Sequence, residues 1–370
     1  MLHLTRNRMR QVAVFAGVIA LTLLTVLGFL PAQATAASNS GDGIGSPQFA
    51  KESLNTSVQH SATTIPNWSS SFTYNGTTYP YTMVGTNPAS GSASSTIPTE
   101  IIPLSFTFSN GVTLDGTTKV QSTIASPIFQ SAAFKSGTTQ YGDAIQRAEF
   151  WNYVSTTSSN YHVLFGQPTV LATESIAVPS NQGTELTGSS SHRQIGLIDY
   201  SWFSSHLKNL LGSLHISSQV MPIFLTYNTF LYQGSTSNCC IIGYHGATSS
   251  TNGNGVQQVN TYIFAAYNDP GIFGVPIEDI NGLSHEESEW LNDPFTNNVV
   301  PAWTVPSEPQ YGCSNALETG DPLVGVAFTV NGYHPQDEAF LSWFARQTPS
   351  TSIDQLYTYL GTFTSYSPSC

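Results

Sequence analysis

The sequence carries little charge. Only 9% of its 370 residues are Asp, Glu, Lys or Arg, against about 25% in ordinary domains. Ten basic residues face 22 acidic ones, which gives a formal net charge of −12. A chain so poor in Lys and Arg lacks the positive surface that nucleic acids and anionic membranes attract, so neither is expected as a partner.

Long apolar runs are also scarce, with one exception at the N-terminus. An uncharged apolar run, Val12–Leu30, follows three arginines and precedes two overlapping A-x-A sites, with cleavage after Ala34 or Ala36. This pattern predicts a signal peptide over residues 1–36 and secretion to the extracellular space. The run is also long enough to span a bilayer, so an uncleaved membrane anchor is the alternative.

Cysteine is limited to four residues, Cys239, Cys240, Cys313 and Cys370. An even count in a secreted chain favours disulfides. A bridge between the adjacent Cys239 and Cys240 would be strained, so each is expected to pair with Cys313 or Cys370. The sequence leaves open which pairs with which, and the spacing is not one that binds zinc.

Three regions follow the signal peptide. Residues 37–65 are rich in Ser, Thr, Asn and Gly and predict a flexible linker. Residues 66–190 are β-rich, because short apolar runs flank turns such as Asn75-Gly76 and Asn110-Gly111, a signature of β-hairpins. Residues 191–370 form the third region, and together these patterns predict an α+β fold.

One helix is expected in the β-rich region, over residues 142–153. Its charged residues Asp143, Arg147 and Glu149 are expected to face solvent or to form ion pairs. In the third region the expected order is strand, helix, several strands and a short helix. These elements cover residues 195–198, 200–211, 220–231, 240–245, 261–267 and 284–294.

The last of these helices carries the candidate site. Residues four apart on an α-helix lie on the same face, about 6 Å apart along its axis, so His285 and Glu289 can bind one ion. Both residue types are zinc ligands. Glu286 lies about 100° around the helix from His285, where a carboxylate can accept a proton from a metal-bound water. The alternative is an acidic helix face in contact with solvent.

The other residues of this helix predict how it is buried and where it begins and ends. Four residues give it an apolar back to bury: Ile280, Leu283, Trp290 and Leu291. Asn281 or Ser284 is expected to cap its start, and Pro294 disfavours helix at Asp293. The sequence offers no account of Glu287 on the apolar side.

The motifs around this helix resemble those of known proteins. His285-Glu286-x-x-Glu289 is similar to the H-E-x-x-H helix of zincin metallopeptidases, with Glu289 in place of the second His. The chain continues through Pro294 and Ala302-Trp303 to Glu318-x-x-Asp321, close to Cys313. Over residues 235–345 this succession resembles plant phosphate-induced (EXORDIUM-like) proteins and uncharacterised secreted bacterial proteins.

The resemblance implies a zincin-like C-terminal region with a metal site. His285 and Glu289 would be metal ligands, Glu286 the general base, and Glu318 or Asp321 the third ligand, with Asp293 as a rival. His334 and His245 are outside candidates, each expected more often as a structural histidine. Tyr333 or His334 would stabilise the oxyanion.

The expected cofactor is Zn²⁺. Ligation rich in oxygen also suits harder ions such as Ca²⁺ or Mn²⁺. One His with two carboxylates cancels the charge of zinc, which weakens it as an electrophile. Segment Cys240–His245 is expected as an edge strand that pairs with a peptide substrate.

Two functions compete on this evidence. The first is a secreted metal-dependent peptidase that acts on proteins or peptides. The second is a non-catalytic secreted protein of the cell surface or wall, whose metal site is structural. An acid peptidase with a Glu–Gln pair is a minor third, and serine catalysis lacks the G-x-S-x-G signature.

Overall fold

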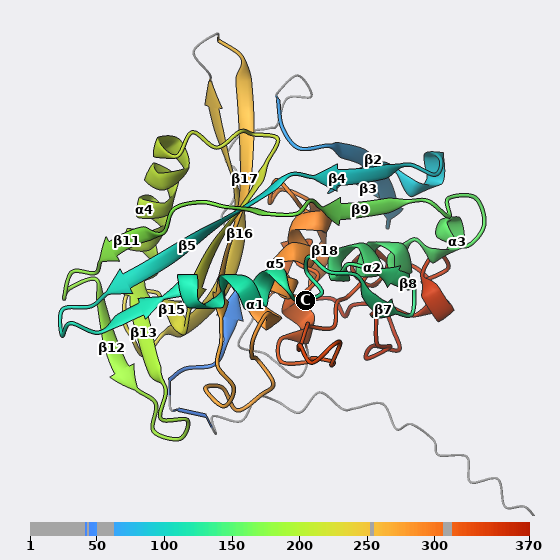
Figure 1. Cartoon of the computed structure of the whole chain (residues 1–370). Coiled ribbons are helices and arrows are strands. Elements are labelled where there is room, and N and C mark those ends of the chain that lie inside the picture. Colours follow the sequence, from blue (N-terminus) through green and yellow to red (C-terminus); the bar gives the residue numbers. More distant parts are fainter. Residues whose placement is uncertain (1–40, 43, 50–62, 252–254, 306–312) are drawn as a thin grey trace, which may run out of the picture. The chain divides into compact units, whose positions relative to one another are not determined.

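The computed structural model describes residues 41–42, 44–49, 63–251, 255–305 and 313–370 (Figure 1). The predicted signal peptide and most of the predicted linker lie outside these residues. Within the described part of the chain, no helix has the length and apolar character needed to cross a membrane.

A mixed sheet of eleven strands organises the fold. The order of its main path is β10 (Thr169–Val170), β5 (Thr99–Thr107), β14 (Met221–Tyr227), β17 (Gln257–Tyr267), β16 (Cys239–Thr251), β15 (Thr229–Tyr232), β13 (Gln194–Asp199) and β12 (Gly183–Thr187). Three further strands pair beside this path: β1 (Gln48–Phe49) with β16, and β6 (Thr113–Asp115) and β11 (Glu174–Ala177) with β5.

The sheet joins the predicted regions. Strand β16 is antiparallel to both of its neighbours on the main path, whereas β5, β14 and β17 are mutually parallel. The boundary expected near residue 190 falls between the paired strands β12 and β13. Strand β1 lies inside the predicted linker and pairs with β16. The α+β class is confirmed in its coarse form, as a strand-rich mixed fold.

Side chains alternate between the two faces of the sheet, as a pleated strand requires. On β14, Ile223 and Leu225 belong to one buried cluster and Phe224 to another. Helix α4 (Tyr200–Ser213) packs on the face of Phe224. The opposite face carries helices α2 (Tyr141–Glu149) and α5 (Asn281–Asn292).

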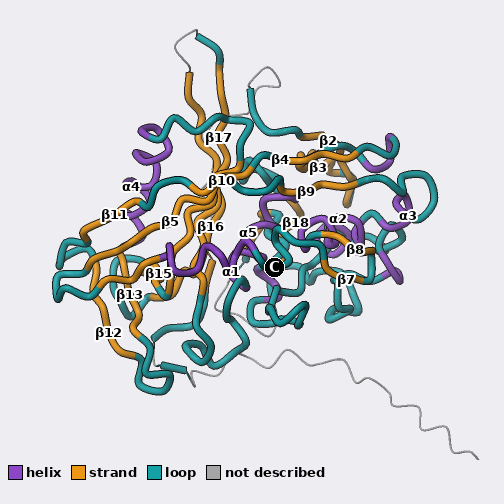
Figure 2. Tube along the Cα trace, in the orientation of Figure 1, coloured by secondary structure: helices purple, strands orange, loops and turns teal. Residues whose placement is uncertain are grey.

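A third buried cluster lies under the hairpin of β2 (Asn67–Tyr74) and β3 (Thr77–Val84). Many of the other residues of this cluster come from the C-terminal part of the chain, which is mostly loop (Figure 2). The smaller elements are β4 (Ser94–Ile97), α1 (Val120–Ile124), β7 (Ala132–Phe134), β8 (Gly137–Thr139), α3 (Trp151–Val154), β9 (His162–Phe165), β18 (Val299–Trp303), β19 (Ser314–Ala316) and α6 (Leu341–Phe344).

Both predicted hairpins are confirmed. Asn75 and Gly76 have positive φ values of 48° and 79°, the conformation that a two-residue hairpin turn requires. The second hairpin joins β5 to β6 through Asn110-Gly111. The helix expected over residues 142–153 is interrupted at Phe150, which separates α2 from α3.

One prediction about a charged residue and one about a strand are wrong. Glu149 is buried and forms no ion pair within the described residues, because the face of α2 that carries it packs inside the protein. Asp143 is also buried, and it forms the expected ion pair, with Nδ1 of His162 at 2.7 Å. Asp143 accepts hydrogen bonds from Thr139 Oγ1 and from the backbone of Val163. Strand β16 lies between β15 and β17, so Cys240–His245 is not an edge strand.

The predicted cysteine pairing is also wrong. The two disulfides join Cys239 to Cys240 and Cys313 to Cys370. The adjacent pair lies at the start of β16, buried at 2% and 0% exposure. The second bridge ties the C-terminus to the segment just before β19.

Candidate metal centre

Helix α5 lies inside the protein, and all twelve of its residues are buried. It packs against β16 and β17, and the predicted apolar residues Ile280, Leu283, Trp290 and Leu291 join the core cluster on that face of the sheet. The helix ends at Asn292, as Pro294 predicts. Its N-cap residue is Ile280, so the expected caps at Asn281 and Ser284 are wrong.

The first candidate ligand group combines His285, Glu289 and Asp321. Nε2 of His285 lies 3.1 Å from Oε1 of Glu289 and 3.8 Å from Oδ1 of Asp321. The side chains of His285 and Glu289 are 0% and 3% exposed, and that of Asp321 is 26% exposed. Asp321 is therefore the member of this group that solvent reaches.

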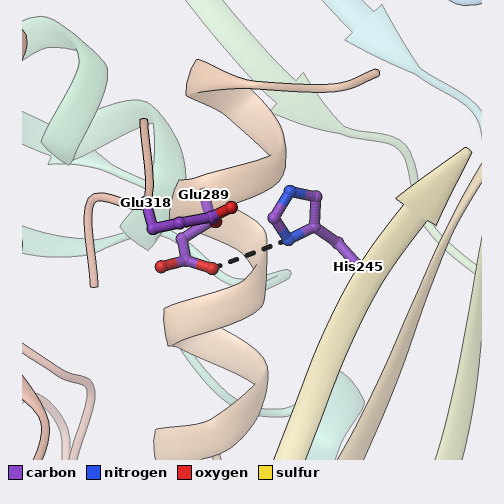
Figure 3. A group of neighbouring side chains, drawn as sticks. All are labelled: His245, Glu289 and Glu318. Carbon is purple, nitrogen blue, oxygen red and sulfur yellow. Dashed lines mark ion pairs between the residues drawn. The ribbon is translucent and has the colours of Figure 1, made fainter. Parts of the chain in front are cut away.

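The second group combines His245, Glu289 and Glu318 and shares Glu289 with the first (Figure 3). His245 extends from β16 towards α5, and its Nδ1 lies 3.6 Å from Oε2 of Glu289. Glu318 comes from the loop after β19 and is hydrogen-bonded to Glu289. The two oxygens of Glu289 thus face two different histidines.

A short loop brings Glu318 and Asp321 to α5. The backbone N–H groups of Gly320 and Asp321 both donate to Oε1 of Glu289, at 3.1 Å and 3.3 Å. A Cβ atom on Gly320 would lie 2.3 Å from Nδ1 of His285, so only glycine allows the loop to approach this closely. Gln336 holds the loop from the other side by donating to the carbonyl of Gly320.

Glu286 lies on the sheet side of α5. Its Oε2 is 3.1 Å from Nδ1 of His245, and its side chain fills the space that a Cβ on Gly243 of β16 would occupy. Its Oε1 has no hydrogen-bond partner within the described residues. The expected general base is therefore next to the second ligand group, in contact with its histidine.

Burial dominates the electrostatics of the centre. It raises the pKa values of Glu286 and Glu289 well above the ordinary range, and the neighbouring carboxylates, Glu318 among them, raise both further. Burial also lowers the pKa of His285 to about 4. Carboxylates gathered away from water must share protons or a cation, because their charges repel one another.

The donor set fits a divalent cation. Two ligand atoms bound to one zinc ion lie at most about 4.4 Å apart, given bonds of about 2.2 Å. The ligand atoms within each group lie within 4.8 Å of one another, so a small adjustment closes the site. One imidazole nitrogen and two carboxylates suit Zn²⁺, and the oxygen-rich set also suits Mn²⁺ or Ca²⁺.

The structure thus brings together all four predicted ligands, His285, Glu289, Glu318 and Asp321. It does not resolve the choice between Glu318 and Asp321, because each belongs to a different group. The rival ligand Asp293 instead accepts hydrogen bonds from the backbone of Asn297 and Asn298.

The two predicted oxyanion groups have other partners. The Tyr333 hydroxyl donates to the carbonyl of Ser122. Nδ1 of His334 lies 2.7 Å from Oδ2 of Asp279, outside both ligand groups. The unexplained Glu287 accepts a hydrogen bond from the backbone of Gly142 on α2.

Two residues of the centre have a larger role in it than the sequence predicted. His245 was expected to be structural, yet it completes the second group. Nε2 of Gln336 lies 3.0 Å from Nδ1 of His285, a contact that no motif indicated. The available signal for His245 was a lone His in a strand that precedes the H-E-x-x-E helix.

Comparison of the chain with protein-family models found no match, and comparisons with curated proteins and with solved structures found none either. The resemblance to zincins and to EXORDIUM-like proteins therefore rests on the motifs alone.

Proposed function

We propose that this protein is a secreted, non-catalytic metalloprotein of the cell surface or wall, in which a divalent cation at Glu289 fastens the C-terminal loops to α5. The observation that supports this proposal is the position of Glu289, shared by two groups of ligand atoms that each lie within 4.8 Å of one another. The secreted location in this proposal is based on the signal peptide predicted over residues 1–36.

Charge supports a cation in this position. Glu286, Glu289 and Glu318 are each no more than 4% exposed, and Asp321 adds a fourth carboxylate beside them. Bound Zn²⁺ or Mn²⁺ would offset their mutual repulsion without requiring each carboxylate to be protonated. The ligands come from β16, α5 and the loop before Leu323, so one ion would link three separate segments.

Enclosure favours the structural role over catalysis. A catalytic zinc keeps one coordination position open to water or substrate, whereas a structural site is closed. His245, His285 and Glu286 are all 0% exposed. The strand expected to receive a peptide substrate, Cys240–His245, already pairs with β15 and β1 at Ile241 and with β17 from Gly243 onwards.

A metal-dependent peptidase is the second candidate, favoured by the 26% exposure of the Asp321 side chain. An ion near Asp321 would have one side towards solvent. Bound zinc would supply Lewis-acid chemistry and lower the pKa of a water molecule. Glu286 would then hold the proton, a role that requires its side chain to turn from His245.

Metal content by mass spectrometry tests the proposal, on wild type, the double variant His245→Ala/His285→Ala and the control His206→Ala on α4. We expect at least one metal ion per chain in wild type and control, a loss in the double variant, and a melting temperature that falls on chelation. A different result would favour the peptidase: wild type digests casein, and Glu286→Gln keeps its metal but loses this activity. Absence of metal from all three proteins would overturn both.

A further inference from the structure

Three hollows lie near the β2–β3 hairpin and the C-terminal loops. The central hollow has a volume of about 210 Å³, and Trp68, Tyr81, Glu149 and Ser342 are among its lining residues. A second hollow of about 270 Å³ shares Tyr81 with it, and a third of about 320 Å³ shares Ser350. The lining residues of the three hollows include none of the candidate metal ligands.

Aromatic rings form the apolar wall of the central hollow. Trp68 lies between Tyr81 and Phe150, with both ring centroids 5.8 Å from its own and both planes near perpendicular to it. These edge-to-face contacts fix the indole plane. Trp68, Tyr81 and Tyr153 are only partly buried, so part of each side chain stays accessible to a ligand.

Three residues that line the same hollow carry buried polar atoms without a hydrogen-bond partner among the described residues. They are Nε1 of Trp68, Oε2 of Glu149 and Oγ of Ser342. Glu149 is 3% exposed, and its other oxygen accepts a hydrogen bond of 2.7 Å from the backbone of Leu341. Buried polar groups are normally paired, so three such atoms around one cavity indicate a polar ligand.

The ligand they indicate is uncharged. Besides Glu149, Asp354 is the one carboxylate among the described residues that line the three hollows, and no described Lys, Arg or His lines them. The remaining polar lining consists of hydroxyl and amide side chains, such as Ser70, Asn87 and Asn298. Such groups donate to and accept from hydroxyl groups.

Size points to one small ring. A volume of 210 Å³ corresponds to about seven water molecules at about 30 Å³ each, enough for one sugar ring. A sugar ring presents an apolar C–H face that packs on an aromatic ring and a rim of hydroxyl groups for polar partners.

We propose that this surface binds a neutral oligosaccharide, with one sugar ring packed on Trp68 and hydrogen-bonded to Glu149 and Ser342. Binding at this surface is independent of the metal centre, because the two share no residue.

Titration of the full chain with cellohexaose, maltohexaose and chitohexaose, followed by calorimetry and tryptophan fluorescence, tests the proposal. We expect saturable binding of at least one hexasaccharide, unchanged by chelator and weakened at least tenfold in Trp68→Ala. Trp202→Ala, at a partly buried tryptophan of α4, is the matched control and should bind as wild type does.

Glu149→Gln and Ser342→Ala keep the inference testable if Trp68→Ala fails to fold, since both keep the shape of the wall. Each should weaken the same oligosaccharide at least threefold with its circular dichroism unchanged. Absence of saturable binding by all three sugars, or wild-type affinity in the folded variants, would overturn the proposal.

Discussion

The side-chain nitrogen of Gln336 lies 3.0 Å from Nδ1 of His285 and 2.8 Å from the carbonyl oxygen of Gly320. Because it donates to that carbonyl, its second hydrogen is directed at Nδ1 of His285. The neutral ring then carries its own proton on Nε2, the nitrogen that faces Glu289. Metal binding at Nε2 requires the proton on the other nitrogen, so Gln336 opposes it.

Replacing Gln336 with Glu should therefore strengthen metal binding. A carboxylate accepts the proton of Nδ1 and leaves Nε2 free for the ion, the arrangement that usually supports metal-bound histidines. We expect about tenfold tighter binding of Zn²⁺ by calorimetry. Gln336→Leu, which provides no acceptor, should not show this gain, and equal affinity in both variants would contradict the tautomer argument.

Each ligand group contains its own histidine, so the metal stoichiometry of the two histidine variants tests which groups bind an ion. If both groups bind an ion with Glu289 as the shared ligand, His245→Ala and His285→Ala should each reduce the stoichiometry by one, and Glu289→Gln should reduce it further. Mass spectrometry of the metal-loaded proteins measures these numbers. Full stoichiometry in His245→Ala would confine the ion to the group of His285 and Asp321.

Gly320 should be intolerant of any side chain. A methyl group there would lie 2.3 Å from Nδ1 of His285, so Gly320→Ala must displace either the ring or the loop. We expect a loss of about 1–3 kcal/mol in the free energy of unfolding, as overpacking causes. Gly212→Ala on α4, where a Cβ meets nothing within 4 Å, is the control and should be neutral or slightly stabilising in urea denaturation.

Glu149 should make the protein less stable as pH rises. Burial raises its pKa from 4.5 to about 7, so between these values the folded state holds a proton that the unfolded state has released. The contribution is absent below pH 4.5, and above pH 7 it lowers the free energy of unfolding by about 3 kcal/mol. The hydrogen bond from the backbone of Leu341 limits the shift.

Glu149→Gln should remove this dependence. The nearby Tyr81 and Tyr161 stay protonated throughout this range, since burial raises the pKa of each above 10. The gap in stability between variant and wild type should therefore widen from pH 4.5 to pH 8 in urea titrations. A gap that does not change with pH would show that Glu149 is ionised in the folded protein across the range.

The disulfide between Cys313 and Cys370 should stabilise the C-terminal loops. It closes a loop with a sequence separation of 57, for which loop entropy predicts about 4 kcal/mol. Cys370→Ser should lower the melting temperature in non-reducing buffer. Because the variant lacks this bridge, adding a reducing agent to it should cause no further loss from the same disulfide. An unchanged melting temperature would mean that packing around Trp303 and Trp343 already holds the segment.

Local features follow from short stretches of the sequence. Asn75-Gly76 sets the first hairpin because few other pairs tolerate positive φ at both positions, and Gly111, with a φ of 87°, has the corresponding role in the second. Pro294 ended α5, and the four-residue spacing placed His285 and Glu289 on one face because helix geometry depends only on position in the chain.

Tertiary packing alone decided the rest. His245 reaches Glu289 across 44 residues of chain and Gln336 reaches His285 across 51, and no periodicity records such contacts. The burial of Glu149 and the interior position of β16 likewise depend on how distant elements pack and pair. Side-chain pattern specifies a local conformation, whereas the neighbours of a residue follow from how distant elements share one core.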